Sequence, residues 1–150
     1  MAASYPPVSF HFQVKFIDEK GAWDFDSDFR FQSVSGLDAS LETSSFAEGG
    51  ENRFTHALPT RARYPNLILK RGLITDSLLI DWCEDAIIYL NIYPLNVDIG
   101  LLDDSHQPLI IWTAVHAYPV RWSISEFNAE QNQLAIETLE LKYQYFYYSF

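Results

Sequence analysis

The sequence predicts a mainly β protein, a small β-barrel or sandwich with one α-helix packed outside it. Three observations support this class. Apolar and polar residues alternate with a period of two over most of the chain, as they do in half-buried strands. Aromatic residues, which favour strands, make up 16% of the chain. Only one stretch, from Asp76 to Asn91, has apolar residues at helical spacing.

The helical stretch has a clear start and stop. Thr75 or Asp76 is the expected N-cap, and Pro94 prevents continuation. The expected buried face consists of Leu78, Leu79, Trp82, Cys83, Ala86, Ile87 and Leu90, and the expected polar face of Ser77, Asp81, Glu84 and Asp85. Trp82 lies in the middle of the apolar face, so it is predicted to be the core anchor that fixes the helix to the sheet.

Strands are expected over most of the remaining chain. A bend at 117–120 is expected to separate two of them, and a phase slip near Glu137 and Thr138 predicts a bulge or a change of face in the last one. The expected strands are 8–16, 29–34, 38–44, 67–70, 96–102, 109–116, 121–125 and 134–148.

Length, charge and cysteine content exclude several classes. The 150 residues are expected to form one domain, 1–150. A formal net charge of −10 opposes a general nucleic-acid-binding role. The single cysteine, Cys83, excludes an intramolecular disulfide. No apolar run has the ~18 residues of a membrane span, so no membrane insertion is expected, and no signal peptide is seen, so assembly is expected in the cytoplasm.

Two polar segments are expected to be exposed loops, 18–28 and 45–57. The second contains Glu48, Gly49, Gly50 and Arg53, and it reads as a long mobile loop or hairpin. Half of all the positive charges lie close together in sequence, at Arg53, Arg61, Arg63, Lys70 and Arg71. This clustering indicates either a patch for an acidic partner surface or ordinary local neutralisation of charge.

No catalytic, cofactor-binding or metal-binding residue is predicted. The four histidines are scattered through different elements, and the metal, nucleophile and dinucleotide motifs are missing. The expectation is therefore that the protein is not an enzyme. A small hydrolase with a non-local site stays open, because carboxylates are plentiful.

Several segments, taken together, resemble the tail tube protein family of contractile phage tails and phage-tail-like contractile injection systems. No single segment is specific, but together they follow the family's order, with Asp81-Trp82 on the helix that comes after Asn66–Gly72. The segments are Tyr5–Val8, Val34–Asp38, Glu48-Gly49, Asn66–Gly72, Asp81-Trp82, His116–Pro119 and Ala135–Leu141.

The resemblance implies a homo-hexameric ring that continues its strands across subunits and stacks into a hollow tube. It also implies baseplate hub or spike proteins and a surrounding sheath as partners, with cargo or a tape-measure protein in the lumen. Segments 18–28 and 45–60 and the aromatic C-terminus depart from the family pattern, which favours an initiator ring joining the tube to the baseplate hub over the repeating subunit. The particle would be a phage tail or an extracellular or intracellular injection particle.

Contacts between subunits or between rings are predicted for Glu48, Gly49, Gly50, Arg53, Arg61, Arg63, Tyr145, Phe146 and Phe150. A protein of another class stays open as the alternative. In that reading the chain is a monomeric β-sandwich binding module, and 45–57 is its mobile ligand loop.

Overall fold

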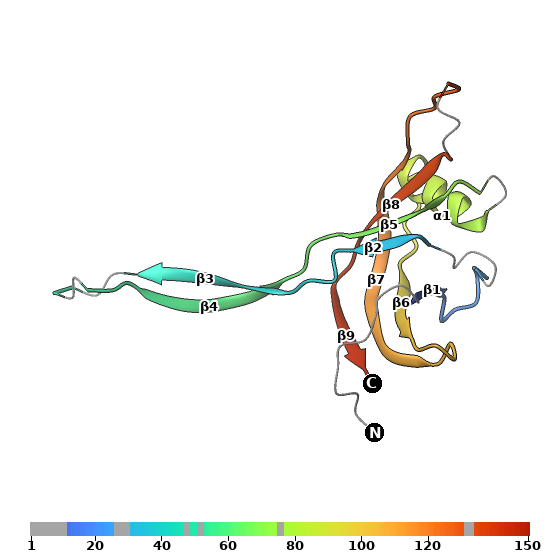
Figure 1. The fold of residues 1–150 in the computed structure, drawn as a ribbon. Coiled ribbons are helices and arrows are strands. Elements are labelled where there is room, and N and C mark those ends of the chain that lie inside the picture. The colour runs from blue at the N-terminus through green and yellow to red at the C-terminus, as the bar shows by residue number, and fades with distance from the viewer. Residues whose placement is uncertain (1–11, 26–30, 47–48, 51–52, 75–76, 131–133) are drawn as a thin grey trace.

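The computed structural model describes residues 12–25, 31–46, 49–50, 53–74, 77–130 and 134–150, and it is mainly β with one helix in those ranges (Figure 1). This confirms the predicted fold class. The elements are β1 Phe12–Ile17, β2 Ser33–Ser35, β3 Ser40–Phe46, β4 His56–Arg63, β5 Leu67–Gly72, α1 Leu78–Ile87, β6 Leu95–Leu102, β7 Pro108–Ile124, β8 Ile136–Lys142 and β9 Tyr145–Ser149.

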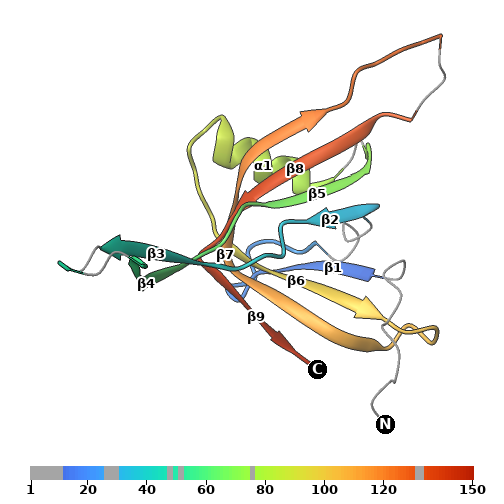
Figure 2. The same cartoon turned by 60° about the vertical axis from the view of Figure 1, so that its left-hand side comes forward.

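Two four-stranded antiparallel layers share the long strand β7 (Figure 2). Sheet A has the order β1-β6-β7-β9 and uses residues 108–117 of β7. Sheet B has the order β7-β8-β5-β2 and uses residues 118–124. The two layers enclose the core.

The core is built from the alternating inward residues of both sheets and from one face of α1. Trp82 is 1% exposed, and its ring lies against Phe16 and Phe25 at centroid distances of 5.8 and 6.1 Å. Its indole N–H donates to the Tyr93 carbonyl at 2.8 Å. The helix is therefore held to the sandwich by a large ring whose polar atom is satisfied.

The helix is shorter than predicted at both ends. Its N-cap is Ser77, whose Oγ accepts a hydrogen bond from the Leu79 N–H at 3.2 Å. Ser77 is buried, whereas the sequence placed it on the polar face. The C-terminal end closes with Leu90 in the left-handed region (φ 56°) and with a bond from the Asn91 N–H to the Asp85 carbonyl. The predicted burial of Leu78, Ile87 and Leu90 is wrong: they are 42, 40 and 79% exposed. Leu78 and Ile87 are the two end residues of the helix, and Leu90 lies beyond it, although the helical spacing of apolar residues continues that far.

The predicted bend at 117–120 does not interrupt the strand. β7 runs through it, but His116 has φ 54° and the register with β8 shifts between Pro119 and Arg121. The partner strand breaks at the same corner, between β8 and β9, where the Gln144 N–H donates to the Val115 carbonyl. Both strands thus pass from one sheet to the other together.

The predicted phase slip near Glu137 and Thr138 is wrong. β8 is regular, and Glu137, Leu139 and Leu141 all point into the core. The change of phase comes after Tyr143, because the strand must turn there to join sheet A. The apolar Leu134 and Ile136 indicate a slip in the sequence, but Leu134 is 66% exposed and Glu137 is buried in phase with Leu139.

The hairpin β3–β4 projects from the body as a long arm (Figure 1). Neither strand contacts another described helix or strand of the chain. Of the two structures predicted for 45–57, a loop or a hairpin, the described residues show the hairpin, since 45–46 belong to β3 and 56–57 to β4. Strands of 7 and 8 residues carry the tip roughly 20–25 Å from the body at about 3.3 Å per residue.

Candidate assembly surfaces

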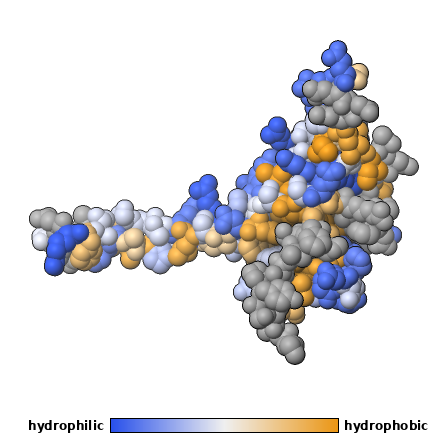
Figure 3. Space-filling view, viewed as in Figure 1, coloured by the Kyte–Doolittle hydropathy of each residue, from blue (hydrophilic) through white to orange (hydrophobic). Residues whose placement is uncertain are grey.

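The arm has two different faces, because side chains alternate along its paired strands; a bulge between Glu42 and Thr43 shifts the pairing register. The Thr60 hydroxyl donates to the Glu42 carbonyl at this bulge, at 2.9 Å. One face, the small face, consists of Leu41, Thr43, Ser45, Ala57, Pro59 and Ala62. The other, the mixed face, consists of Ser40, Glu42, Ser44, Phe46, His56, Leu58, Arg61 and Arg63. Apolar groups are visible along one side of the arm (Figure 3).

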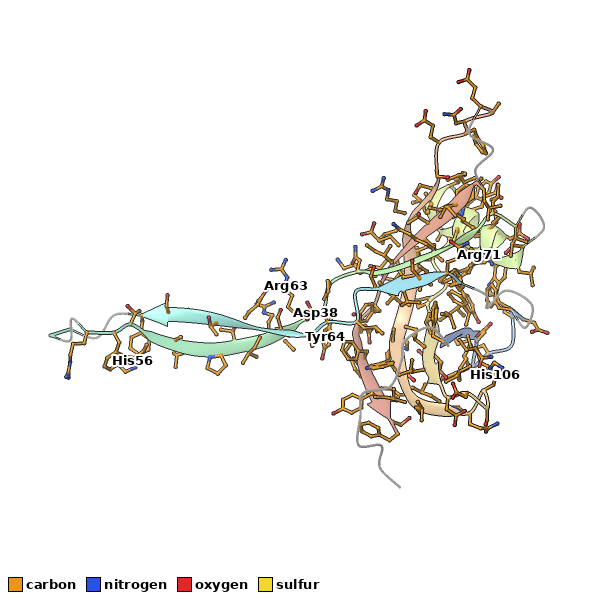
Figure 4. The ribbon with its side chains drawn as sticks, viewed as in Figure 1. Asp38, His56, Arg63, Tyr64, Arg71 and His106 are labelled. Carbon is orange, nitrogen blue, oxygen red and sulfur yellow. The ribbon has the colours of Figure 1, made fainter. Side chains whose placement is uncertain are left out.

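The basic patch predicted from sequence is smaller than expected. Arg61 and Arg63 lie on the arm near its root, but both approach Glu42, at 3.4 and 3.8 Å. Arg71 is not on the surface at all: it is 1% exposed and lies inside the body (Figure 4). Local neutralisation therefore accounts for part of the cluster.

The arm ends in aromatic rings. His56 stacks on Phe46 with ring centroids 5.0 Å apart, and Phe54 meets the His56 ring edge-on at 4.9 Å. Phe46 and Phe54 are still 47 and 53% exposed. Gly49 and Gly50 form the turn beyond them, with φ 89° at Gly50, and Arg53 follows it. Glu48 lies outside the described residues.

The side of sheet A that faces away from the core is here called the outer face; most of its residues are at least partly exposed, whereas Gly100 and Thr113 are buried. It comprises the residues that alternate with the buried ones: Gln13, Lys15, Ile17, Asn96, Asp98, Gly100, Leu102, Ile111, Thr113, Val115, Tyr145, Tyr147 and Ser149. Lys15 and Asp98 are directly opposite each other and are its only ionised residues, so this face is neutral in a chain of net charge −10. The Thr113 hydroxyl donates to Asp98 at 2.7 Å.

Both edges of sheet A lack a partner among the described strands. β1 pairs only with β6, and β9 pairs only with β7. An edge strand offers a row of unpaired backbone N–H and C=O groups, so it is a template for strand addition. These two edges run antiparallel to each other, because three antiparallel pairings separate them.

The predicted C-terminal residues separate into two environments. Tyr145 and Tyr147 lie on the outer face of sheet A, 45 and 52% exposed. Phe146 points the other way and packs on Tyr64 and Tyr143. Phe150 is 93% exposed and touches only the ring of Tyr148 among the ring contacts of the described residues.

The first half of the predicted loop 18–28 is anchored over the core. Phe25 is buried and stacks with Trp23 at 5.8 Å, while residues 26–28 lie outside the described ranges. Burial acts to raise the pKa of Asp18, but the N–H groups of Trp23 and Lys20 and the Tyr93 hydroxyl donate to it at 2.9 to 3.0 Å and hold that pKa below its ordinary value. This half is therefore a fixed cover rather than a loose acidic loop.

A group of apolar side chains remains exposed after the end of α1. Ile88, Tyr89, Leu90 and Ile92 are 51 to 79% exposed. A hollow lies beside them between α1 and the second half of β7, lined by Ile80, Cys83, Ile87 and Val120 among others. Burial raises the pKa of the Cys83 thiol to about 12, so this residue is an inert part of the core.

In the described ranges, no group of three or more His, Cys, Asp or Glu side chains could hold a metal ion. Among the same residues, no helix has the length and apolar character needed to cross a membrane.

Free sheet edges, a projecting arm and scattered exposed rings define a protein that assembles through its surfaces. A model of the family described as T4-like virus tail tube protein gp19 matches residues 8–147, so the chain belongs to this family. The predicted resemblance is confirmed, and the chain is a structural tube subunit of a phage tail or contractile injection particle. A search of curated proteins found no match.

Solved structures agree with the family. The chain is 36% identical to one in the cryo-EM structure of the anti-feeding prophage (AFP) baseplate, 6-fold symmetrised, with a TM-score of 0.89 over 98% of this chain and 97% of that one. A chain of the PVC extracellular contractile injection system, in its extended sheath–tube complex, shows the same fold at 24% identity and TM-score 0.80, over 97% and 93%. Hcp1 from Flavobacterium johnsoniae is similar in fold at 13% identity and TM-score 0.54, over 92% and 94%.

The structure brings some predicted residues together and separates others. Gly49, Gly50 and Arg53 meet at the arm tip, Arg61 and Arg63 near its root, and Tyr145 lies on sheet A. Sequence reasoning missed Glu42 and the aromatic tip. The Gly49-Gly50 turn between two short segments of strand length, 40–46 and 56–63, was the signal that could have revealed the arm.

Proposed function

We propose that this chain forms a ring of identical copies in which sheet A closes into one continuous barrel around a lumen. The antiparallel relation of β1 and β9 carries this proposal. When β9 of one copy meets β1 of the next, the junction is itself antiparallel, and the same step can be repeated around a ring. Closure removes both unpaired edges, which would otherwise promote aggregation.

The number of copies is proposed to be six. The AFP baseplate is 6-fold symmetrised, and four strands from each of six copies would give a barrel of 24 strands. A barrel that large encloses an open channel rather than a packed core. The outer face of sheet A, which points away from the subunit core, would line this channel. Because the face is neutral, it would neither attract nor repel a passing chain strongly.

The arm is proposed to lie on a neighbouring copy. It contacts no other described element of its own chain, and its small face offers uncharged, compact side chains for close packing. Gly49, Gly50, Arg53 and the aromatic tip would then meet an adjacent subunit or ring. Exposed ion pairs are weak singly, so contacts repeated around the ring would have to add up.

Covalent trapping tests ring closure. Tyr147→Cys on β9 would be combined in turn with Gln13→Cys, Lys15→Cys or Ile17→Cys on β1, because junction residues on one face come within disulfide distance, a Cα separation of ~4.4–6.8 Å. At least one pair is expected to give a disulfide ladder ending at six subunits on a non-reducing gel. Tyr147→Cys with Lys70→Cys on sheet B is the matched control. Rings seen by electron microscopy without a ladder from any β1 position would reject this junction.

We further propose that the ring is the initiator that joins the tube to the baseplate hub. Two observations support this: the 36% identity to a chain of the AFP baseplate against 24% to the PVC sheath–tube chain, and the departures from the repeating-subunit pattern. The hub or spike would be its partner on one side, tube rings on the other, and cytoplasmic assembly would precede release of the particle. Residues 1–150 would act as one domain.

Copy number separates the two roles. Quantitative mass spectrometry of purified particles should find one ring of this chain per particle, far fewer copies than of the repeating tube subunit. A copy number equal to that of the sheath would show that the chain is the repeating subunit. A particle-free monomer at high concentration would favour the binding-module alternative.

A further inference from the structure

The two ends of the arm are in close backbone contact where they join the body. The chain leaves the body after Gly36 and returns at Asn66, and these two points touch. Gly36 has φ 98°, and a Cβ there would lie 2.2 Å from the Asn66 carbonyl oxygen. Only glycine permits both the backbone conformation and the contact. The two strands of the arm therefore depart from one fixed point.

Three aromatic rings surround this point. Tyr64, at the end of the returning strand, lies 6.0 Å from Tyr143 and 5.3 Å from Phe146, the latter in an edge-on arrangement. Tyr143 and Phe146 are 6.4 Å apart, and the Tyr143 hydroxyl donates to the Gly36 carbonyl at 3.3 Å. Such ring pairs are worth about 0.5–1.5 kcal/mol each beyond their burial. Figure 4 shows Tyr64 at the junction of arm and body.

The rings come from parts of the chain with different tasks. Tyr64 belongs to the arm root, Tyr143 to the corner after β8, and Phe146 to the unpaired edge strand β9. The outer face of β9 stays exposed while its inner face holds the arm root. The side chain of Phe146 thus connects the arm root to the edge strand of sheet A.

We propose that Gly36, Tyr64, Tyr143 and Phe146 form a mount that sets the direction of the arm relative to β9. The position of the tip of a long arm is sensitive to small rotations at its root. A free rotation of about 10° at the root of an arm roughly 23 Å long displaces its tip by about 4 Å, more than packed surfaces tolerate. The mount belongs to the single subunit, while its use in holding the arm on a neighbour rests on the proposed ring.

Distance measurements between spin labels test the mount without requiring a ring. One label would be placed at Ser44→Cys on the arm and one at Ser105→Cys on the exposed β6–β7 turn. The buried Cys83 would not react at neutral pH. Labelled subunits would be diluted with unlabelled ones, so that only distances within one subunit contribute.

The Tyr64→Ala and Phe146→Ala variants are expected to broaden the arm–body distance distribution by about 4 Å. Tyr64→Phe keeps the ring and should leave it as narrow as in the parent. Tyr147→Ala is the matched control on β9, since this residue faces the other side. A second label pair inside the body, at Ser105→Cys and Lys142→Cys, should not change in any variant.

The outcomes discriminate clearly. An arm–body distribution that stays narrow in Tyr64→Ala, or that broadens equally in Tyr147→Ala, would overturn the mount. Broadening of the body pair would also overturn it, because the rings would then support the whole fold rather than the arm. If the mount holds but no disulfide ladder forms, the ring junction is wrong and the mount stands.

Discussion

Arg71 and Glu137 form a buried ion pair between directly opposed positions of β5 and β8, with 2.6 Å between Nε and Oε2. The two side chains are 1 and 2% exposed. Arg71 Nη2 also donates to Ser77 Oγ at 2.8 Å, and Trp122 Nε1 donates to the second carboxylate oxygen of Glu137 at 2.7 Å. One charge pair thus ties sheet B to the N-cap of the helix.

Removing one member of this pair should be costly. Arg71→Met is expected to lower the free energy of unfolding by about 3–5 kcal/mol, because Glu137 would stay buried without its cation. The double variant Arg71→Met/Glu137→Leu should recover most of that loss, since no unpaired charge remains. Denaturant unfolding measures both.

The arm offers the matched control for this cycle. Arg61→Met removes a cation whose side chain is 79% exposed, opposite Glu42, and should cost less than about 1 kcal/mol. If Arg71→Met costs no more than Arg61→Met, the buried pair is not a determinant of stability.

The helix anchor leads to a second prediction. Trp82→Ala should cost about 3–5 kcal/mol in the free energy of unfolding, as large-to-small core substitutions do. Tyr89→Ala, just beyond the helix at a position 67% exposed, should change it by about 0.5 kcal/mol or less. Thermal unfolding of the two variants compares them, and equal midpoints would contradict the anchor role.

The sequence predicted the fold class because alternation and helical spacing report directly on burial. It could not locate the change of phase in the last strand, because Arg71 and Glu137 satisfy each other inside the core and polarity no longer reports exposure there. The second strand of the arm was not predicted, for a related reason: β3 and β4 pair only with each other among the described strands, so burial imposes no pattern on them. The residues of such an assembly surface are covered only by a partner, so the apolar and polar alternation of one chain does not reveal them.

The C-terminal end of the helix provides a stabilising substitution. Leu90 adopts φ 56° and is 79% exposed, so its side chain gains little burial while its Cβ strains the left-handed conformation. Leu90→Gly is expected to raise the free energy of unfolding by up to about 1 kcal/mol. Leu90→Ala retains the Cβ and should not share the gain. A destabilised glycine variant would mean that the Leu90 side chain contributes to packing.

The Asp18 carboxylate should make the fold sensitive to acid. Its pKa lies below the ordinary value of 3.8 in the folded state, because the donors from Trp23, Lys20 and Tyr93 favour the charged form over the opposing effect of burial. A lowered folded-state pKa contributes stability that is present above the unfolded pKa and lost as the pH falls through the folded value. The wild-type protein should therefore exceed Asp18→Asn in stability at neutral pH, and the difference should shrink below about pH 4. Denaturant unfolding between pH 7 and pH 3 measures it, with Asp104→Asn in the exposed β6–β7 turn as the control. A difference that stays constant over this range would show that the hydrogen bonds to Asp18 do not depend on its charge.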